Sequence, residues 1–364
     1  MKNPFRPSAG ATPPQIIGRA GLLEEFTYGM ELGAGAPGLL AIFTGARGIG
    51  KTVMLGEAHD AARQRGWAVI AETATPGFFE RIGSKMRRIY EELGSGSEGR
   101  RVTGVMVAGL SVSMSAPAEQ QVSWEEQGQK LLSLLAEQGT GLVVTVDEIH
   151  AADRTELSQL AAYAQHYIQA DLPIALIFAG LPAAVSDLLN EGVATFLRRA
   201  DKYDLHAAAI GEVEKSYVEL FGQSGMKIEP GVLKRAAQST GGYPFLIQLV
   251  GYYLWRAAEA GGGKLDAEAA DKAIEAALRR HERSVIEAAL ASASPRDMDF
   301  LNALAQLERP AAIKDIAAAM VTSQSQASNY RTRLVASGLA EPAGYGKVDF
   351  AIPGLAQYLA RTQR

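Results

Sequence analysis

The sequence contains no cysteine, which excludes disulfide bonds, a thiol nucleophile and every metal site built from thiolates. Its five histidines are scattered, and none has the spacing expected of paired metal ligands. Long apolar runs are also missing. The longest, 174–181, is far shorter than the ~20 residues needed to cross a bilayer, and no signal-peptide core follows Met1. These absences predict a soluble, cytoplasmic protein that does not enter a membrane.

The charge balance excludes one class of binding protein. With 36 basic and 40 acidic residues, the 364-residue chain has a formal net charge of −4. A protein that binds polyanions through its bulk charge would be basic, so any contact with nucleic acid must be confined to a local patch. The length is sufficient for two or three domains.

One short stretch carries the clearest chemistry. The apolar run 39–44 has the length of a fully buried strand, and a helical pattern extends from about 52 to about 65. Between them the chain fits G-x-x-x-x-G-K-[ST], the phosphate-binding loop. Glycines let successive backbone N–H groups point at phosphate oxygens, and the helix adds its positive dipole end. The predicted nucleotide-binding residues are Gly45, Ala46, Arg47, Gly48, Ile49, Gly50, Lys51 and Thr52.

Four residues of two motifs receive specific roles. The Lys51 ammonium would contact the β- and γ-phosphates of ATP, and the Thr52 hydroxyl would be a ligand to Mg²⁺. A second buried-strand run, 142–146, ends at Asp147 and Glu148. We predict that Asp147 holds the same Mg²⁺ through its water shell and that Glu148 is the general base that polarises the attacking water. The alternative is that this acidic pair only caps the following helix.

Strand and helix patterns alternate within 15–209, which we interpret as one domain. The strand-like runs are 39–44, 67–73, 141–146, 173–178 and 202–205. The alternation predicts an α/β fold with a parallel, doubly wound sheet and a ligand at the carboxyl ends of its strands. Residues 95–120 are interpreted as an insertion with a β-hairpin at 102–115, and its role is not evident. The basic residues of a helix predicted at 77–93 are interpreted as a solvated face.

Three further segments complete the predicted organisation. Residues 1–14, which contain several prolines, are expected to be flexible or draped over the surface. Only helical patterns occur in 210–291, which predicts a small helical domain. Residues 295–364 show two helices, a turn, a third helix and a glycine-containing pair of strands, which is typical of a winged helix-turn-helix.

The third helix of this last segment has a surface suited to duplex DNA. Ala327, Tyr330 and Leu334 share one face and are expected to point inward. Short polar residues opposite them, flanked by arginines, would suit a helix laid in a groove between phosphates, with a lysine on the wing. The predicted DNA-binding residues are Ser325, Asn329, Arg331, Thr332, Arg333 and Lys347. The alternative is a winged helix that docks a protein, its arginines being merely solvated.

These motifs together resemble those of prokaryotic AAA+/STAND-type ATPases with an origin-recognition-like (Orc1/Cdc6-like) nucleotide domain. In this resemblance 45–52 is the Walker A motif and 144–148 the Walker B motif. The resemblance implies a P-loop NTPase of the ASCE, AAA+-like class. It also implies a helical lid at 210–291 and the winged helix at 295–364, and so extends over almost the whole chain beyond the first fourteen residues.

The same resemblance adds residues that would contact the base of the nucleotide. Gly18 and Arg19 match a Gly-Arg box that in such proteins lies against adenine. Residues 240–245 resemble a Gly-x-Pro lid motif, whose proline, here Pro244, would pack near the base.

Two departures from the family pattern concern hydrolysis. Members usually carry a polar sensor at the end of the fourth strand, where this chain has Phe-Ala-Gly at 178–180. They also carry a sensor arginine in the lid, where the first arginine after Gly242 is the late Arg256. These departures predict normal ATP binding with slower or differently gated hydrolysis. Arg198 or Arg199 would be an arginine finger, in cis or in trans, or would only stabilise a helix end.

A rival enzyme class uses the same letters, because 147–150 spells the D-E-x-H box of superfamily-2 helicases. Such helicases need a second RecA-like domain, and 211–290 is helical, so we reject that interpretation. The sequence predicts an ATPase that acts as a switch, coupling its ATP and Mg²⁺ site to a DNA-binding winged helix. A nucleotide-stabilised scaffold that docks a protein is the alternative. The expected partners are ATP or ADP, double-stranded DNA and further copies of the chain, and no membrane.

Overall fold

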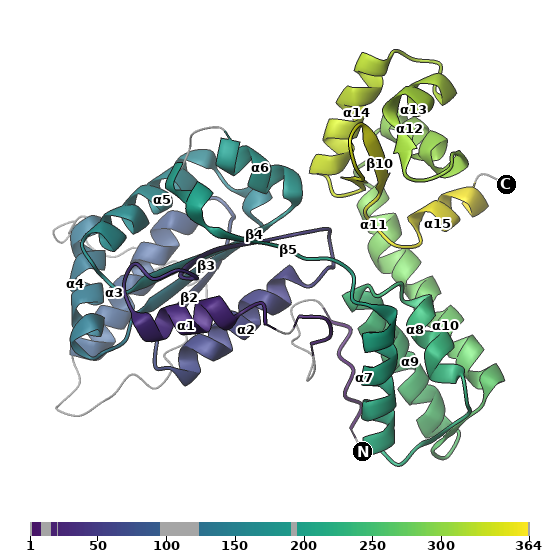
Figure 1. Ribbon diagram of the computed structural model, residues 1–364, viewed down its shortest axis with the longest axis horizontal. Coiled ribbons are helices and arrows are strands. Elements are labelled where there is room, and N and C mark those ends of the chain that lie inside the picture. The colour runs from purple at the N-terminus through teal and green to yellow at the C-terminus, as the bar shows by residue number, and fades with distance from the viewer. Residues whose placement is uncertain (1, 9–15, 20, 95–123, 191–194, 363–364) are drawn as a thin grey trace. The chain divides into compact units, whose positions relative to one another are not determined.

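The computed structural model describes residues 2–8, 16–19, 21–94, 124–190 and 195–362. They form two compact units (Figure 1). The sheet unit comprises residues 21–44 and 51–204, and the C-terminal unit comprises residues 1–20, 45–50 and 205–364. The insertion and hairpin predicted within 95–120 lie outside the described residues.

A five-stranded, fully parallel sheet forms the centre of the sheet unit (Figure 1). Its order is β2-β3-β4-β1-β5, so β1 pairs with two strands that follow it much later in the chain. The central strands are buried and mostly apolar because helices cover both faces of such a sheet. The predicted α/β fold with a parallel sheet is confirmed. The strands are β1 (Leu40–Thr44), β2 (Ala68–Thr73), β3 (Leu142–Asp147), β4 (Ile174–Gly180) and β5 (Asp201–Asp204).

The helices of this unit pack on the sheet through periodic apolar residues. Phe78, Ile82 and Met86 recur every four positions in α3, and all three are buried with Leu131 of α4 in the core of the unit. Asp153 begins α5 by accepting two backbone N–H bonds of its first turn. The helices are α1 (Glu24–Leu32), α2 (Lys51–Gln64), α3 (Phe78–Gly94), α4 (Trp124–Glu137), η1 (Ile149–Ala151), α5 (Arg154–Gln169), α6 (Pro182–Asn190) and η2 (Thr195–Arg199).

His59 joins α2 to the sheet and makes the unit sensitive to acid. Its Nε2 lies 2.7 Å from Oγ1 of Thr145 in β3. Burial, assisted by the Arg63 guanidinium, lowers the pKa of His59 from 6.5 to about 4. Above pH 6.5 the imidazole is neutral in both folded and unfolded states, so it contributes no pH dependence. Between pH 6.5 and 4 only the unfolded state takes up the proton, so stability must fall as the pH falls.

We therefore expect His59 to cost the protein about 2–3 kcal/mol of unfolding free energy between pH 7 and pH 4, allowing for its partial exposure. His59→Gln keeps a polar partner for Thr145 but cannot titrate, so its stability should depend less on pH by that amount. Urea unfolding of both proteins across this range measures the difference. Parallel stability profiles for the two proteins would show that His59 is not a buried neutral imidazole.

A group of helices forms the first part of the C-terminal unit. Tyr217, Phe221, Leu254 and Trp255 are fully buried at its centre, and the Tyr217 hydroxyl donates to the Ile247 carbonyl at 2.7 Å. Two short strands pair in parallel beside these helices. The elements are α7 (Ile210–Gln223), β6 (Lys227–Ile228), α8 (Val232–Ser239), α9 (Pro244–Ala260), β7 (Lys264–Leu265) and α10 (Ala267–His281).

The described N-terminal residues, 2–8, pack on the helices of the C-terminal unit. Phe5 is only 3% exposed and packs against the rings of Tyr217, Phe221 and Trp255. The Asn3 side chain also donates to a backbone carbonyl of α9. Residues 2–8 are therefore held on the helices, because one aromatic side chain buries enough apolar surface to hold the extended chain.

The last part of the C-terminal unit has its own core. Ser294 and Asp297 form a capping box at the start of α12, with Pro295 in the first turn. Ala327 and Leu334 of α14 are buried in this core. The elements are η3 (Glu282–Ile286), α11 (Glu287–Leu290), α12 (Pro295–Gln306), β8 (Ala311–Ala312), α13 (Ile313–Ala319), α14 (Gln324–Ala336), β9 (Ala340–Pro342), β10 (Lys347–Phe350) and α15 (Leu355–Thr362). The three strands form an antiparallel sheet in the order β8-β10-β9. Among the helices of the described ranges, none is long and apolar enough to span a membrane.

Candidate functional site

The loop between β1 and α2 adopts a backbone that requires glycine. Gly48 and Gly50 have φ angles of 72° and 96°, in the left-handed region that other residues avoid. A Cβ at Gly48 would collide with the phenol of Tyr243. A Cβ at Gly45 would lie 2.7 Å from the Leu205 carbonyl oxygen, which is too close for any side chain. Conformation and close approach together explain the glycines of this loop.

Two side chains of the C-terminal unit hold the loop by its carbonyl groups. Arg19 donates from Nη2 to the Ile49 carbonyl at 3.1 Å and to the His206 carbonyl at 2.6 Å. The Tyr243 hydroxyl donates to the Arg47 carbonyl. Burial lowers the pKa of the Arg19 guanidinium, which is half-enclosed here. Arg19 thus shapes the loop through backbone contacts, and its contact with adenine stays a prediction.

Gly18 and Pro244, predicted to lie near the base of the nucleotide, occupy constrained positions. Gly18 has a φ of 70°, and a Cβ there would lie 3.0 Å from the Ala208 methyl group. Pro244 is the first residue of α9, where its missing N–H costs no hydrogen bond. A Cβ at Gly50 would meet the Pro244 ring at 3.9 Å, an ordinary contact distance. The roles predicted for both residues stay predictions.

Within the sheet unit, the two predicted Mg²⁺ ligands meet although 95 positions separate them. Thr52, in the first turn of α2, donates from Oγ1 to Oδ2 of Asp147 at 2.6 Å. Asp147 is the last residue of β3, at the carboxyl edge of the sheet. Lys51 is the first residue of α2 and is 7% exposed. A hydroxyl and a carboxylate side by side are the hard oxygen ligands that Mg²⁺ prefers.

Glu148 leaves β3 in a left-handed conformation, with φ 57° and ψ 40°, which is uncommon for a residue other than glycine. Its N–H donates to Asp147 Oδ1 at 2.8 Å, and its Oε2 lies 3.1 Å from Nδ1 of His150. Ile149 is buried in the space that a side chain at Gly180 would need. Ile149 therefore occupies the space beside Gly180 at the end of β4, where this chain has no polar residue. Its burial holds the turn that follows β3.

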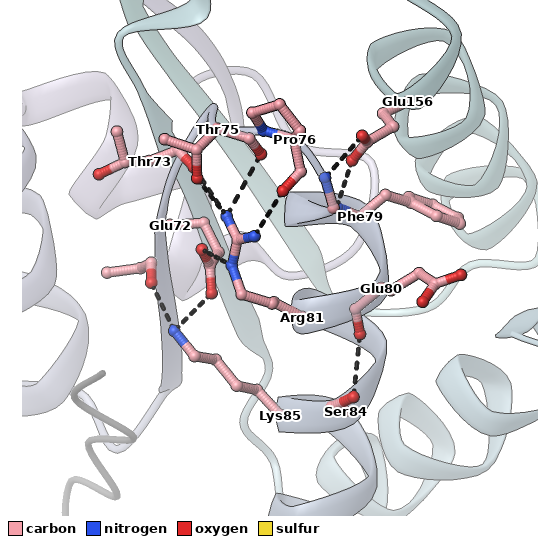
Figure 2. A network of polar contacts seen from close by, with 12 residues as sticks. Glu72, Thr73, Thr75, Pro76, Phe79, Glu80, Arg81, Ser84, Lys85 and Glu156 are labelled. Atoms are coloured by element: carbon pink, nitrogen blue, oxygen red, sulfur yellow. Dashed lines mark hydrogen bonds and ion pairs between the residues drawn. The ribbon is translucent and has the colours of Figure 1, made fainter. Parts of the chain in front are cut away.

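Figure 2 shows a polar cluster at the end of β2 that the sequence analysis did not predict. The Glu72 side chain is 7% exposed and pairs with Arg81 at 3.0 Å and Lys85 at 2.7 Å. Arg81 also donates to three carbonyls of the preceding loop, those of Thr73, Thr75 and Pro76. The interpretation of the basic residues of α3 as a solvated face is thus wrong for this pair. In the same loop, the Ala74 N–H donates to the Asp147 carbonyl at 2.9 Å. The cluster therefore stabilises the end of the sheet at which Asp147 lies.

The two candidate finger arginines end the short helix η2 in the sheet unit. Both side chains are exposed. Arg198 donates from Nε to the Leu189 carbonyl at 2.8 Å, which secures the end of α6. The Arg199 side chain makes no such hydrogen bond to a carbonyl of the described residues. The finger role of Arg198 or Arg199 stays a prediction.

The face of α14 that was predicted to meet DNA is exposed. Ser325, Asn329 and Thr332 are all exposed, whereas Ala327 and Leu334 point into the core. Lys347, the remaining candidate of this group, begins β10 and is also exposed.

The two arginines of α14 are not equivalent. Arg333 pairs with Asp297 of α12 at 2.5 Å and lies over the Tyr330 ring, 5.0 Å from its centroid. Burial raises the pKa of Asp297, but hydrogen bonds from Arg333 and Ser294 outweigh it and hold that pKa below its usual value. Arg331 is half-buried, and its Nε has no hydrogen-bond partner among the described residues. Arg333, one of the two arginines predicted to contact phosphate, is therefore already paired with a carboxylate of the protein.

Comparison with known families narrows the class of the protein. Residues 15–177 match the model of the family described as the AAA ATPase domain. This match supports a P-loop ATPase of the AAA+ class. Residues 283–359 match a second family model, described as a domain of unknown function (DUF8462). No curated protein sequence matches the chain.

Several solved structures align with this chain over most of its length. A Walker-type ATPase of Pyrococcus abyssi aligns over 95% of this chain and 96% of its own, with 15% identity and a TM-score of 0.65. Orc1 of Aeropyrum pernix, solved in complex with DNA, aligns over 96% and 94% with 16% identity and a TM-score of 0.46. A RuvB variant of Thermotoga maritima aligns over 99% of both chains with 12% identity and a TM-score of 0.48. At these identities the first likeness shows a shared fold alone, and the other two are weaker still.

Proposed function

We propose that this protein binds ATP with Mg²⁺ at residues 45–52 and hydrolyses it as a molecular switch. The observation that carries the proposal is the 2.6 Å hydrogen bond between Thr52 Oγ1 and Asp147 Oδ2. It brings together one side chain from each of two motifs, close enough for both to serve one ion. The match of residues 15–177 to the AAA ATPase domain supports the same class.

The donor set fits Mg²⁺. This ion demands octahedral geometry with oxygen ligands, and it keeps several waters while one or two protein oxygens and the phosphates complete its shell. Thr52 and Asp147 supply oxygens of that kind. When bound, the ion would neutralise charge that develops on the phosphate oxygens during transfer.

The phosphates would be held by the loop backbone, by Lys51 and by the amino end of α2. That helix has 14 residues, long enough for its dipole to attract an anion at its first turn. Lys51 is largely withdrawn from water, so its charge would be weakly screened and its attraction for phosphate strong. Arg19 would contribute indirectly, because it fixes the Ile49 carbonyl at the end of the loop.

Glu148 would take the proton of the attacking water. Its side chain is 47% exposed, so water can reach it. His150 engages Oε2, which restricts the carboxylate and leaves Oε1 to accept the proton. Arg198 or Arg199 would stabilise the transition-state charge in this site or in that of a neighbouring copy. The test is Mg²⁺-dependent phosphate release by the full chain, which Glu148→Gln should suppress.

We further propose that residues 295–364 are a winged helix that binds duplex DNA. Three helices are followed by a strand pair that joins a three-stranded antiparallel sheet, which supports this assignment. The segment has eight basic and six acidic residues, a net charge of +2, in a chain whose net charge is −4. Asn329 is exposed on α14 and is short enough to let a backbone approach base edges.

Protein docking by the same segment is a second candidate, favoured by two exposed apolar side chains. Val321, before α14, is 93% exposed, and Tyr345, between β9 and β10, is fully exposed. The internal pairing of Arg333 with Asp297 also leaves fewer charges for phosphate. A measurement of duplex DNA binding separates the two candidates.

For DNA binding, Arg331→Ala and Lys347→Ala should each weaken the affinity for all duplex sequences and lower the salt slope by about one. Each removes one cation that would neutralise a phosphate. Asn329→Ala should instead change any sequence preference. Fluorescence anisotropy of labelled mixed-sequence duplex with the full chain, across a salt series, measures these effects.

Arg296→Ala is the matched control for that experiment. Arg296 is an exposed arginine of the same segment that pairs with Asp299 on α12 rather than lying on α14. It should leave the salt slope unchanged. Failure of the full chain to bind duplex at low salt, or equal loss with all three variants, would favour protein docking instead.

A further inference from the structure

A tight double-glycine turn fixes the tyrosine that contacts the phosphate-binding loop. Gly241 and Gly242 have φ angles of 56° and 74°, and the Gly242 N–H donates to Thr240 Oγ1 at 3.1 Å. The Ala208 N–H donates to the Gly242 carbonyl at 2.8 Å. Tyr243 follows this turn, is 1% exposed, and donates from its hydroxyl to the Arg47 carbonyl. A change in the backbone at Arg47 must therefore move or release the Tyr243 hydroxyl.

The buried imidazole of His281 lies against the same tyrosine. Their ring centroids are 6.0 Å apart at 70°, and Phe245 flanks the imidazole at the same distance. His281 is 1% exposed, and its Nε2 lies 3.0 Å from the Pro353 carbonyl. A carbonyl can only accept, so Nε2 carries the proton and donates to it.

The other ring nitrogen of His281 is not satisfied. Nδ1 is buried and has no hydrogen-bond partner among the described residues. Burial also lowers the pKa of this imidazole, which keeps it neutral and Nδ1 unprotonated. An apolar ring of the same size would avoid the unpaired nitrogen but would leave the Pro353 carbonyl without its donor, so packing alone does not explain a histidine here.

His281 lies where the first helical part of the C-terminal unit meets the last segment of the chain. It is the last residue of α10, which belongs to the first helical core of the unit through Ala277. The next residues form η3, a π-helix of five residues, which places Ile286 in the core of the last segment. Figure 1 shows α10 running on through this turn into α11. Arg361 of α15 pairs with Glu282 of the turn at 2.5 Å, close to the bond from His281 to Pro353.

We propose that Tyr243 and His281 are positioning residues that link the phosphate-binding loop to the last segment of the chain. The link runs from the Arg47 carbonyl through the Tyr243 phenol and the His281 imidazole to the Pro353 carbonyl. This inference rests on the proposed nucleotide binding. Because coupling is reciprocal, nucleotide at the loop should change the stability of the contacts at Pro353, and those contacts should change nucleotide affinity.

The experiment compares amide hydrogen exchange in peptides covering 350–362, with and without saturating ATP and Mg²⁺, in the full chain. ATP binding is measured on the same samples with a fluorescent analogue. In the unmodified protein, nucleotide should change exchange in these peptides by about fivefold or more, the usual lower bound for coupled sites. Tyr243→Phe removes only the hydroxyl, and His281→Phe removes only the imidazole nitrogens. Either change should reduce the response to below about twofold at saturating nucleotide, and the double variant should lose no more.

Two further variants show whether the effect is specific. Tyr217→Phe deletes another buried hydroxyl bonded to a backbone carbonyl in the same unit, away from the loop, and should leave the response intact. His281→Gln retains a donor for the Pro353 carbonyl and should restore part of the response. A response that persists in both Tyr243→Phe and His281→Phe would overturn the link, as would its absence in an unmodified protein that binds ATP. An unmodified protein that binds no ATP would instead overturn the proposed function, and the link with it.

Discussion

Replacing Lys51 by alanine is expected to weaken ATP binding by about 30-fold or more, because truncating one partner of a desolvated charge pair costs about 2–5 kcal/mol. The Lys51 side chain is only 7% exposed at the start of α2, so solvent cannot substitute for its charge on the phosphates. Titration of the full chain with a fluorescent ATP analogue in Mg²⁺ measures the change in affinity.

Lys130→Ala is the matched control for the lysine substitution. Lys130 lies on the exposed face of α4 and pairs with Glu126 at 2.7 Å, so the same chemical change there should not affect ATP affinity. Thermal unfolding of Lys51→Ala shows whether the fold is kept. Unaltered ATP affinity in a folded Lys51→Ala protein would mean that residues 45–52 are not the phosphate-binding site.

The second large effect is expected at Glu148. Glu148→Gln keeps the size of the side chain and an oxygen for the contact with His150, but it removes the base. Turnover should fall by ~10²–10⁴, the usual contribution of general acid–base catalysis. Because Glu148 is not among the proposed phosphate or Mg²⁺ contacts, ATP affinity should change little. Phosphate release at saturating ATP gives the rate, and the titration used for Lys51 gives the affinity.

The split between rate and affinity makes this substitution informative. Loss of both together would point to a disturbed Asp147, whose carboxylate accepts the Glu148 N–H, rather than to a missing base. Unchanged turnover in Glu148→Gln would show that another group activates the water. His150 is the nearest candidate for that role, since its Nδ1 lies 3.1 Å from Glu148 Oε2.

The parts of the molecule that could be predicted follow local rules. Apolar runs such as 142–146 are too long and uninterrupted for an exposed segment, so the strands and their parallel pairing followed from pattern alone. The loop glycines and Lys51 were evident because phosphate binding by a backbone needs those residue types at that spacing. The strand order β2-β3-β4-β1-β5, in contrast, depends on pairings between distant segments and was not predicted.

What could not be predicted depends on contacts between residues far apart in the sequence. Arg81 and Lys85 have the spacing of a solvated helix face, and only the buried Glu72 carboxylate makes them structural. Phe5 stands in a segment of disordered composition, yet a pocket built from α7 and α9 buries it. His281 gives no sequence signal of its own, because its hydrogen-bond partner, the Pro353 carbonyl, lies 72 positions later in the chain.

The central claim is that the loop 45–52 binds ATP with Mg²⁺, and isothermal titration calorimetry of the unmodified full chain tests it most directly. We expect one nucleotide per chain, with an affinity that falls when Mg²⁺ is removed, because the Thr52 and Asp147 oxygens act through the ion. We also expect Lys51→Ala to weaken this binding by about 30-fold or more. Absence of binding at ATP concentrations up to about 1 mM, the upper range of enzyme substrate affinities, would contradict the account.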